Sequence, residues 1–466
     1  MENFTFKLQP EDKKPLYEQL YRYIIEEIEA GRLKNGEKLP SKRAICAHLH
    51  ISQSTVETAY GMLTAEGYLR ARPKSGYYVS ADLYRPVSRS AVPAVEKASA
   101  PRETVRYDFS TGAVDTGVFP YASWARLSRE VVSQNPQLLQ RGEAQGDMAF
   151  RQALAEFLRE YRGVRCQPDQ IVVGAGLEYL LNVLVQVLPE NSVYGLEDPG
   201  YYAAWQVLRN HGRACRMIPL DDSGLREDKL RESGATVAFV TPSHQFPMGC
   251  TMPVSRRAAL LSWAREDENR FIVEDDYDSE FRYASRPIPA MQSLDDGGKV
   301  IYVGTFSRSI APSIRVAYLV LPRRRLPVYE QRLGFAASTV SRFEQQTLAA
   351  FLQRGLYGRH LRRAANLYRK KQQVLLEELA KIPGAQVWGA QAGLHFLLTV
   401  PGKSEEWLVE QAAKAGVPVR GLSSYCRACE CPESTLVLGF AGLQLEDIPA
   451  AAQALREAFE DKIQNS

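Results

Sequence analysis

The sequence predicts a multidomain chain, with a small α+β domain at the N-terminus and a larger α/β domain whose β-sheet is mainly parallel. Residues 1–81 contain short capped helices followed by a hairpin pattern. Further along, short apolar strands such as Ile171 to Val173 alternate with helical stretches, which favours parallel strands covered by helices on both faces. Between these parts, residues 82–105 carry prolines, alanines and serines without apolar periodicity, so we expect a linker.

Length and composition restrict the class of protein. At 466 residues, about three domains are expected, and 45% hydrophobic residues are enough for sizeable cores. No charged-then-apolar leader opens the chain, and no apolar run approaches the ~20 residues of a membrane helix. We therefore expect a cytoplasmic protein with no membrane partner. Seven cysteines, an odd number, favour reduced thiols over a disulfide framework.

Helix signals in the first domain follow one another closely. Tyr17 to Ala30 has apolar residues at helical spacing and stops at Gly31. Ser41 and Ser52 then each cap a short helix, and two such helices joined by a tight turn form a helix-turn-helix. Small polar residues at the start of the second of these two could reach base edges and phosphates in a major groove.

A hairpin is predicted after these helices. Gly67 to Arg72 and Ser75 to Val79 are its strands, and its tip is basic. From Lys38 to Ser80 basic residues outnumber acidic ones, which suits a surface that faces phosphates. Taken singly, a capped helix pair is more often structural than DNA-binding, and a basic face is often merely solvated. The ordered series is much more specific than any of its pieces.

That series, from Pro15 to Tyr68, closely resembles the GntR-type winged helix-turn-helix. The resemblance implies a double-stranded DNA operator as partner. One departure is Gln53, which stands where these proteins usually carry an arginine; glutamine can still pair with adenine or with a phosphate. The residues that should face DNA by this resemblance are Ser41, Arg43, Ser52, Gln53, Ser54, Thr55, Lys74, Ser75 and Gly76.

Two strands of the second domain are followed by residues suited to a ligand. Gly174-Ala175-Gly176 follows Ile171 to Val173 and opens a helix over Glu178 to Leu188, whose free amides would receive a phosphate. Asp275 follows Phe271 to Val273, at the edge of an α/β sheet where ligands bind. Taken alone, a Gly-x-Gly turn is more often a packing feature, and Asp275 belongs to an acidic cluster that could simply be exposed.

From about Tyr107 onward the chain resembles a fold-type I aminotransferase, and with the winged helix it resembles MocR-type transcription regulators over nearly its whole length. The resemblance implies a homodimer that binds pyridoxal 5′-phosphate (PLP). It also implies an effector and dimerisation domain over residues 106–466, with a smaller α+β subdomain over approximately 335–466. Five motifs carry it: Gly174 to Gly176, Glu197 to Tyr201, Pro242 to Gly249, Glu274 to Phe281 and Gly304 to Arg315.

The same resemblance assigns roles around the cofactor. Tyr201 would stack on the pyridine ring, Asp275 would pair with the ring nitrogen, and Tyr277 would hydrogen-bond the ring hydroxyl. Thr305, Ser307 and Arg315 would hold the phosphate together with the helix start. The full expected cofactor-binding set is Gly176, Leu177, Glu178, Tyr201, Asp275, Tyr277, Thr305, Ser307, Arg308 and Arg315.

Arg308 stands where the enzymes carry the lysine that forms a Schiff base with PLP. A guanidinium with a pKa above ~12 stays protonated and cannot attack an aldehyde. No residue is therefore assigned a catalytic role, and PLP is expected to bind noncovalently or to be absent. The expected function is a DNA-binding transcription regulator that senses PLP or a related small amine or amino acid. An alternative is a PLP-dependent aminotransferase disabled by a Lys-to-Arg replacement at 308.

Two further positions depart from the enzymes. Phe246 fills the place of an asparagine, and Val437 the place of the arginine that grips the substrate carboxylate. Arg420 or Arg427 could substitute for that arginine, but sequence spacing does not decide between them.

Three cysteines lie close together in the sequence near the C-terminus. Cys426, Cys429 and Cys431 form a Cys-x2-Cys-x-Cys pattern. Thiols at this spacing could bind a metal or respond to oxidation, although a zinc site would need a fourth ligand. A thiol- or metal-responsive regulator is therefore kept as a third interpretation, and no metal-binding residues are assigned.

Overall fold

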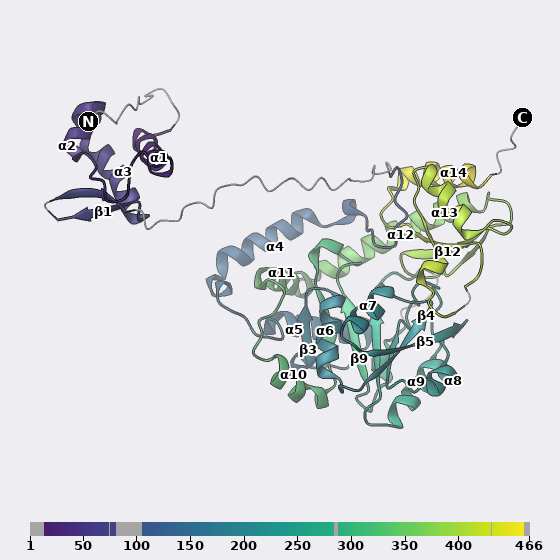
Figure 1. Ribbon diagram of the computed structural model, residues 1–466. Coiled ribbons are helices and arrows are strands. Elements are labelled where there is room, and N and C mark those ends of the chain that lie inside the picture. The colour runs from purple at the N-terminus through teal and green to yellow at the C-terminus, as the bar shows by residue number, and fades with distance from the viewer. Residues whose placement is uncertain (1–13, 74, 81–104, 284–287, 430, 461–466) are drawn as a thin grey trace, which may run out of the picture. The chain divides into compact units, whose positions relative to one another are not determined.

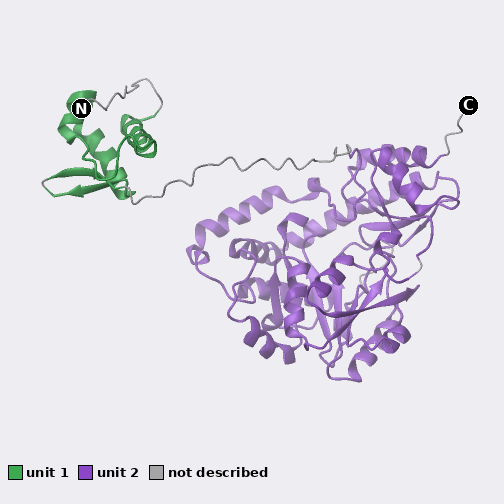
Figure 2. Ribbon diagram, in the orientation of Figure 1, with its two compact units in different colours: residues 1–100 green, residues 101–466 purple. Residues whose placement is uncertain are grey.

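The computed structural model describes residues 14–73, 75–80, 105–283, 288–429 and 431–460. Two compact units make up the chain, residues 1–100 and residues 101–466 (Figure 2). Apart from Val105, the linker predicted at 82–105 lies outside the described residues, as does Lys74. No helix within the described ranges is long and apolar enough to cross a membrane.

The first unit has the predicted winged helix-turn-helix arrangement. Ser41 Oγ accepts the Ala44 N–H at 3.2 Å and Ser52 Oγ accepts the Thr55 N–H at 3.2 Å, so both predicted helix caps are confirmed. Tyr60 is fully buried among the helices and donates its hydroxyl hydrogen to the Pro40 carbonyl at 3.0 Å. The elements are α1 (Leu16–Glu29), α2 (Lys42–Leu49), α3 (Gln53–Ala65), β1 (Leu69–Arg72) and β2 (Gly76–Val79).

β1 and β2 pair antiparallel, with Leu69 opposite Val79 and Arg72 opposite Gly76 (Figure 1). Leu69 and Val79 are buried against the helices, which fixes the register of the hairpin. The other end of the hairpin projects as the wing.

The second unit is built on an eight-stranded sheet in the order β3-β10-β9-β8-β7-β4-β5-β6. β9, β8, β7, β4 and β5 are mutually parallel, so the predicted mainly parallel sheet is confirmed. β10 runs antiparallel to both of its neighbours, and β6 antiparallel to β5. The strands are β3 (Ile171–Gly174), β4 (Val193–Asp198), β5 (Ala214–Asp221), β6 (Gly224–Leu225), β7 (Val237–Val240), β8 (Phe271–Asp276), β9 (Val300–Thr305) and β10 (Ala317–Val320).

Helices cover both faces of this sheet. Ile171 and Val173 of β3 pack with α5 and α11 on one face, whereas Val172 packs with α6 on the other (Figure 1). This alternation follows from the two-residue period of a strand. The helices of this layer are α4 (Tyr121–Gln134), α5 (Met148–Arg162), α6 (Leu177–Val187), α7 (Tyr202–Asn210), α8 (Glu227–Glu232), α9 (Val254–Arg265), α10 (Leu326–Leu333) and α11 (Arg342–Gln353).

A smaller α+β subdomain follows, with a four-stranded antiparallel sheet in the order β11-β12-β14-β13. Its core also receives Phe109 from the start of the unit, and the Gly439 N–H donates to the Phe109 carbonyl at 2.8 Å. α11 instead packs in the core of the large sheet. The elements are α12 (Leu356–Leu379), β11 (Gln386–Trp388), β12 (His395–Thr399), α13 (Glu405–Lys414), β13 (Arg420–Gly421), β14 (Thr435–Gly439) and α14 (Ile448–Phe459).

Candidate functional site

A pocket of about 530 Å³ opens at the carboxyl ends of β4, β8 and β9. Every residue of the predicted cofactor set lines it, although the set is spread over the sequence from Gly176 to Arg315. The small subdomain contributes Arg420 and Tyr425 to the same walls. The remaining predicted members are Leu177, Glu178, Tyr201, Asp275, Tyr277, Thr305, Ser307 and Arg308.

One end of the pocket is the N-terminus of α6. Gly176 precedes the helix with a φ of +98°, and a Cβ there would lie 2.5 Å from Nη2 of Arg315. Only glycine leaves this space free. The free amide groups of a helix N-terminus and a guanidinium beside them make a site for an anion such as a phosphate.

Glu178 places a carboxylate at this same end. Arg315 Nη2 donates to its Oε2 at 2.9 Å, and the Tyr201 hydroxyl donates to its Oε1 at 3.3 Å. Burial raises the pKa of Glu178, but its own amide N–H, Arg315 and Tyr201 outweigh burial and lower the pKa below its ordinary value. The Glu178 carboxylate therefore carries a negative charge where the sequence predicts a phosphate. It would compete with that phosphate for Arg315, which the sequence did not indicate.

Asp275 lies deeper in the pocket. β8 continues to Asp276, beyond the predicted strand end at Val273, so Asp275 is part of the strand. Its side chain is 5% exposed and has no hydrogen-bond partner among the described residues. Burial, and then Asp276, raise the pKa of Asp275 to about 8. An unpartnered buried carboxyl group in a pocket wall suits a ligand that brings an N–H group, such as a pyridine nitrogen.

Aromatic side chains line the same pocket as Asp275. Tyr201 and Tyr277 both meet Phe246 edge-on, at centroid distances of 6.2 Å and 6.1 Å. The Tyr277 hydroxyl lies 3.1 Å from Nδ1 of His244, and that same nitrogen is 3.0 Å from Oδ2 of Asp278. The structure thus pairs Tyr277 with His244, a residue inside one of the five motifs to which the sequence assigned no role.

Arg308 extends across the pocket. Its Nη1 donates a hydrogen bond to the backbone carbonyl of Thr111. Thr111 lies just after Phe109, whose carbonyl and side chain are bound by the small subdomain. The Arg308 guanidinium therefore links the segment after β9 to a segment that packs on the other subdomain.

The structure separates Arg420 from Arg427, the two arginines that the sequence offered as a carboxylate contact. Arg420 lines the pocket and lies directly opposite Val437 in the β13–β14 pair. Arg427 instead stacks on Tyr202 and Trp205 of α7, with its guanidinium carbon 4.1 Å and 5.5 Å from the ring centroids. Of these two arginines, Arg420 is the one in a position to meet a ligand.

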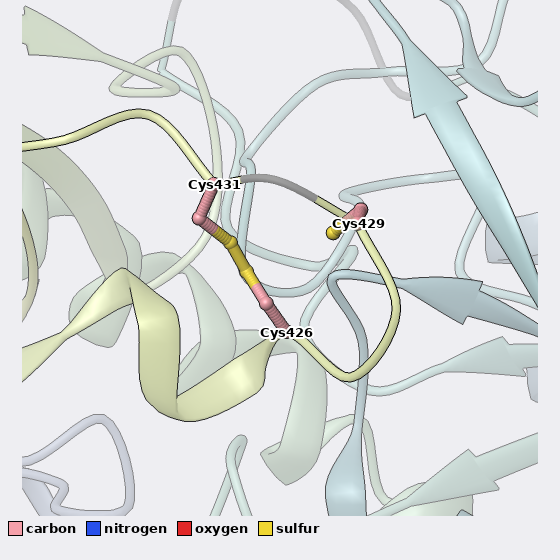
Figure 3. Close-up of side chains that lie close together, drawn as sticks. All are labelled: Cys426, Cys429 and Cys431. Carbon is pink, nitrogen blue, oxygen red and sulfur yellow. A yellow bond between two sulfur atoms is a disulfide. The ribbon is translucent and has the colours of Figure 1, made fainter.

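The cysteine cluster forms a loop next to this pocket. Cys426 and Cys431 are joined by a disulfide, and Cys429 is a free thiol beside them (Figure 3). This differs from the expected reduced thiols, because the Cα atoms of these two residues lie 6.5 Å apart, within reach of an S–S bond. The other cysteines are free, as expected: Cys46, Cys166, Cys215, Cys250 and Cys429.

A buried carboxylate attaches this loop to the large sheet. Asp198 accepts the backbone N–H groups of Arg427, Ala428 and Cys429 at 2.8, 2.7 and 2.9 Å. The Gly200 N–H donates to the Tyr425 carbonyl at 3.1 Å. The disulfide loop is thus held by Asp198 and directly follows Tyr425, a residue of the pocket wall.

In the first unit, the predicted DNA-facing residues gather at the starts of α2 and α3 and at the hairpin tip. Ser41, Arg43, Ser52, Gln53 and Ser54 are exposed, as is Ser75, while Thr55 and Gly76 are half-buried. Lys74 lies outside the described residues.

Glu57 organises part of this surface and was not predicted. Its Oε1 accepts the Gln53 amide N–H at 3.0 Å and pairs with Lys42 Nζ at 3.2 Å. The Gln53 side chain is therefore oriented by a residue of its own helix.

Comparison with known proteins places both units in families. Residues 107–455 match aminotransferase class I and II, and residues 16–79 match the gntR family of bacterial regulatory proteins. The chain is 39% identical over 454 residues to the HTH-type transcriptional regulator YdeL of Bacillus subtilis, covering 96% of this chain and 97% of the relative. It is 33% identical over 465 residues to the probable rhizopine catabolism regulatory protein MocR of Rhizobium meliloti, with coverage of 96% and 94%. The chain belongs to the MocR-type transcription regulators.

This MocR-type chain also shares its larger unit with a solved enzyme. LysN, an α-aminoadipate aminotransferase of Thermus thermophilus solved with N-(5′-phosphopyridoxyl)-L-leucine, superposes with a TM-score of 0.66 and 25% identity. The match covers 77% of this chain and 92% of LysN. The predicted family and fold class are thus confirmed.

Proposed function

We propose that the larger unit of this MocR-type regulator is a receptor for PLP or a PLP-related amine or amino acid, and that it does not transaminate efficiently. One observation carries the proposal. The predicted cofactor residues line a single pocket that contains an unpartnered buried acid, Asp275, while the amine-bearing lysine is replaced by Arg308. Side chains suited to bind PLP are thus gathered in the pocket, and the position proposed for a Schiff-base amine carries a guanidinium.

The chain's own residues suit each part of PLP. The start of α6, Thr305, Ser307 and Arg315 would receive the phosphate, with Glu178 releasing Arg315. Asp275 would pair with the ring nitrogen, either accepting its N–H or sharing one hydrogen with it. When bound, PLP supplies an aldehyde that condenses with amines and a ring that withdraws electrons.

Arg308 restricts the chemistry open to a bound ligand. A guanidinium does not give up its proton near neutral pH, so it neither attacks an aldehyde nor moves protons between carbon atoms. It can hold a ligand by hydrogen bonds, as it now holds the Thr111 carbonyl. These properties favour a receptor that retains its ligand noncovalently.

For the DNA-binding side, we propose that the exposed starts of α2 and α3 contact the operator and that the hairpin contacts the adjacent backbone. We further propose a homodimer, which would present two winged helices to two half-sites. Ligand binding in the larger unit would shift their relative placement, provided that the ligand binds one arrangement better than the other.

The experiment that tests the receptor is the near-visible absorption spectrum of the full-length protein, incubated with PLP and then desalted, with Arg308→Lys beside it. We expect a retained band without covalent attachment in the wild type, and the band of covalently bound PLP in Arg308→Lys. Both preparations are then titrated with a duplex selected by the protein from a random-sequence library, with and without PLP.

The outcomes separate the alternatives. If neither protein retains a pyridoxal species, the pocket is not a PLP receptor. If Arg308→Lys restores transamination while no ligand changes DNA affinity in either protein, the chain is instead a disabled aminotransferase that carries an accessory DNA-binding unit.

A second candidate function, a response to thiol oxidation, is favoured by the disulfide between Cys426 and Cys431. Thiol exchange with an added low-molecular-weight disulfide would form this bond, the two cysteines losing two protons and two electrons and the reagent being reduced to two thiols. Because the loop carries Tyr425 into the pocket wall, oxidation would alter ligand or DNA affinity.

The test compares DNA affinity in oxidising and reducing buffer for wild type, the double variant Cys426→Ser/Cys431→Ser and the control Cys429→Ser. We expect the double variant alone to lose the dependence on redox conditions. A double variant that still responds like the wild type would rule this candidate out.

A further inference from the structure

Besides Arg308 and Arg315, the pocket has a third cationic side chain, Arg420, which comes from the small subdomain. Arg420 lies in β13 and lines the pocket together with Tyr425. It has no carboxylate partner among the described residues. By contrast, Arg315 at the α6 end is already paired with Glu178. An unneutralised guanidinium in a pocket wall attracts an anionic part of a ligand.

The register of the small sheet explains why Arg420 reaches this place. Directly opposite residues in an antiparallel pair project to the same face, and Arg420 lies opposite Val437. Val437 in turn lies opposite Leu397 of β12, and both pack against Phe246, a pocket residue. The face of the small sheet that carries Val437 is therefore the face toward the pocket. Arg420 lies on the same face, in the neighbouring edge strand β13.

The surroundings of Arg420 suit a carboxylate. Burial raises the pKa of Tyr425, and the nearby Arg420 guanidinium and Thr111 side chain oppose that rise, so these three side chains lie close together. Tyrosine and threonine hydroxyls add hydrogen-bond donors beside the guanidinium. The Arg308 guanidinium reaches the Thr111 carbonyl from the large sheet, which leaves this side of the pocket cationic.

We propose that Arg420 is the carboxylate anchor of the effector site, transposed across the β-sheet from the position of Val437, so that the effector is an α-amino acid held with or on the PLP-related ligand. The proposal rests on the proposed function of the pocket as a PLP receptor. A simple amine without a carboxylate would leave Arg420 unused.

The anchor also gives the ligand two attachment points on different subdomains. Its phosphate end contacts the α6 side of the large sheet, and its carboxylate contacts β13 of the small subdomain. A ligand with both groups stabilises the arrangement in which the two sites are spanned, whereas a ligand with only the phosphate does not. An amine and an amino acid would thus stabilise different arrangements of the two subdomains.

The test uses two adducts that differ only in the carboxylate. N-(5′-phosphopyridoxyl)-L-leucine carries it, and N-(5′-phosphopyridoxyl)-isoamylamine is the same molecule without it. Both are titrated by calorimetry into full-length wild type, Arg420→Leu, the control Arg427→Leu, and the transposed double variant Arg420→Val/Val437→Arg. Unchanged binding of the isoamylamine adduct shows that each variant is folded.

We expect the wild type to bind the leucine adduct about tenfold to hundredfold more tightly than the isoamylamine adduct, as one charge-assisted carboxylate contact provides. Arg420→Leu should remove that preference and Arg427→Leu should keep it. The transposed double variant should recover part of it, because its arginine enters from the neighbouring strand of the same face.

Two different failures are distinguishable. If the wild type binds both adducts but Arg420→Leu keeps the preference for leucine, the anchor is wrong while the receptor proposal stands. If the wild type binds neither adduct, the receptor proposal itself fails. A wild type that binds both adducts equally also overturns the anchor.

Discussion

Asp275 sits among several buried acids, and their partners decide their charge. Asp276 is held ionised by Arg162 at 2.7 Å and the Tyr302 hydroxyl at 2.5 Å, and these contacts outweigh burial and lower its pKa. Asp275 has no such partner among the described residues, and its pKa rises to about 8. Neighbouring residues of one strand thus hold opposite protonation states at neutral pH.

The raised pKa of Asp275 predicts a pH-dependent stability. A carboxyl group with a pKa of about 8 when folded and ~4 when unfolded stabilises the protein at low pH, and this contribution is lost as pH rises from 4 to 8. Asn resembles the protonated acid, so Asp275→Asn should have a higher melting temperature than the wild type at pH 8, with a smaller difference at pH 5. The effect is worth roughly 1.4 kcal/mol for each pKa unit of difference.

Scanning calorimetry of the ligand-free protein at both pH values measures this. Asp228→Asn is the control, because Arg226 lowers the pKa of this exposed acid to about 2 and its charge is constant between pH 5 and 8. Equal differences from the wild type at both pH values in Asp275→Asn would contradict the assigned protonation state.

At single positions, the sequence predicts residue chemistry better than residue contacts. Arg308 stands within one sequence motif, but its partner Thr111 lies 197 positions away in the sequence. The choice between Arg420 and Arg427 depended on a strand register that spacing does not reveal. Each of these contacts is made by folding, between residues that no local pattern connects.

Among the elements, β8 is the instructive departure. The sequence ends the strand at Val273 and leaves open that the following acids are exposed, but Glu274, Asp275 and Asp276 are all buried within it. Glu274 accepts the backbone N–H groups of Met291 and Gln292 at 2.6 and 2.8 Å. A run of acids in a sequence suggests an exposed loop. Here the groups that compensate the burial of Glu274 lie in a later part of the chain, so the local sequence does not reveal them.

The start of α6 can be tested by filling the space that Gly176 leaves open. Gly176→Ala places a Cβ at a φ of +98° and 2.5 Å from the Arg315 guanidinium, so the anion site should be displaced. We expect at least a tenfold loss of affinity for pyridoxamine 5′-phosphate, equivalent to about 1.4 kcal/mol. Fluorescence titration measures it.

Gly355→Ala is the matched control for that variant. Its φ is +63°, with nothing within 4 Å of the added carbon and no place in the pocket. We expect it to cost about 1 kcal/mol of stability and to leave ligand affinity unchanged. Equal affinity in Gly176→Ala and the wild type would contradict the phosphate site at α6.

For the whole molecule, the class of fold was predictable because buried parallel strands are short continuous apolar runs. Strand direction was less predictable. β10 is as apolar as its neighbours β3 and β9, yet it runs antiparallel to both. The assembly of the small subdomain was hidden as well, because Phe109 joins its core from the opposite end of the unit. Periodicity reports which faces are buried, and not which distant segments meet there.

Phe109 and Thr111 lie near the start of the larger unit. They belong to the first stretch of chain after the segment that joins the two units, so the peptide that leaves the DNA-binding unit enters the larger unit as a wall of the ligand pocket. Under the proposed function, a ligand that draws Arg308 away from the Thr111 carbonyl would free the residues where the larger unit begins. Signalling from the pocket to the operator would then begin in the chain segment that leads to the first unit, and not in the core of the larger unit.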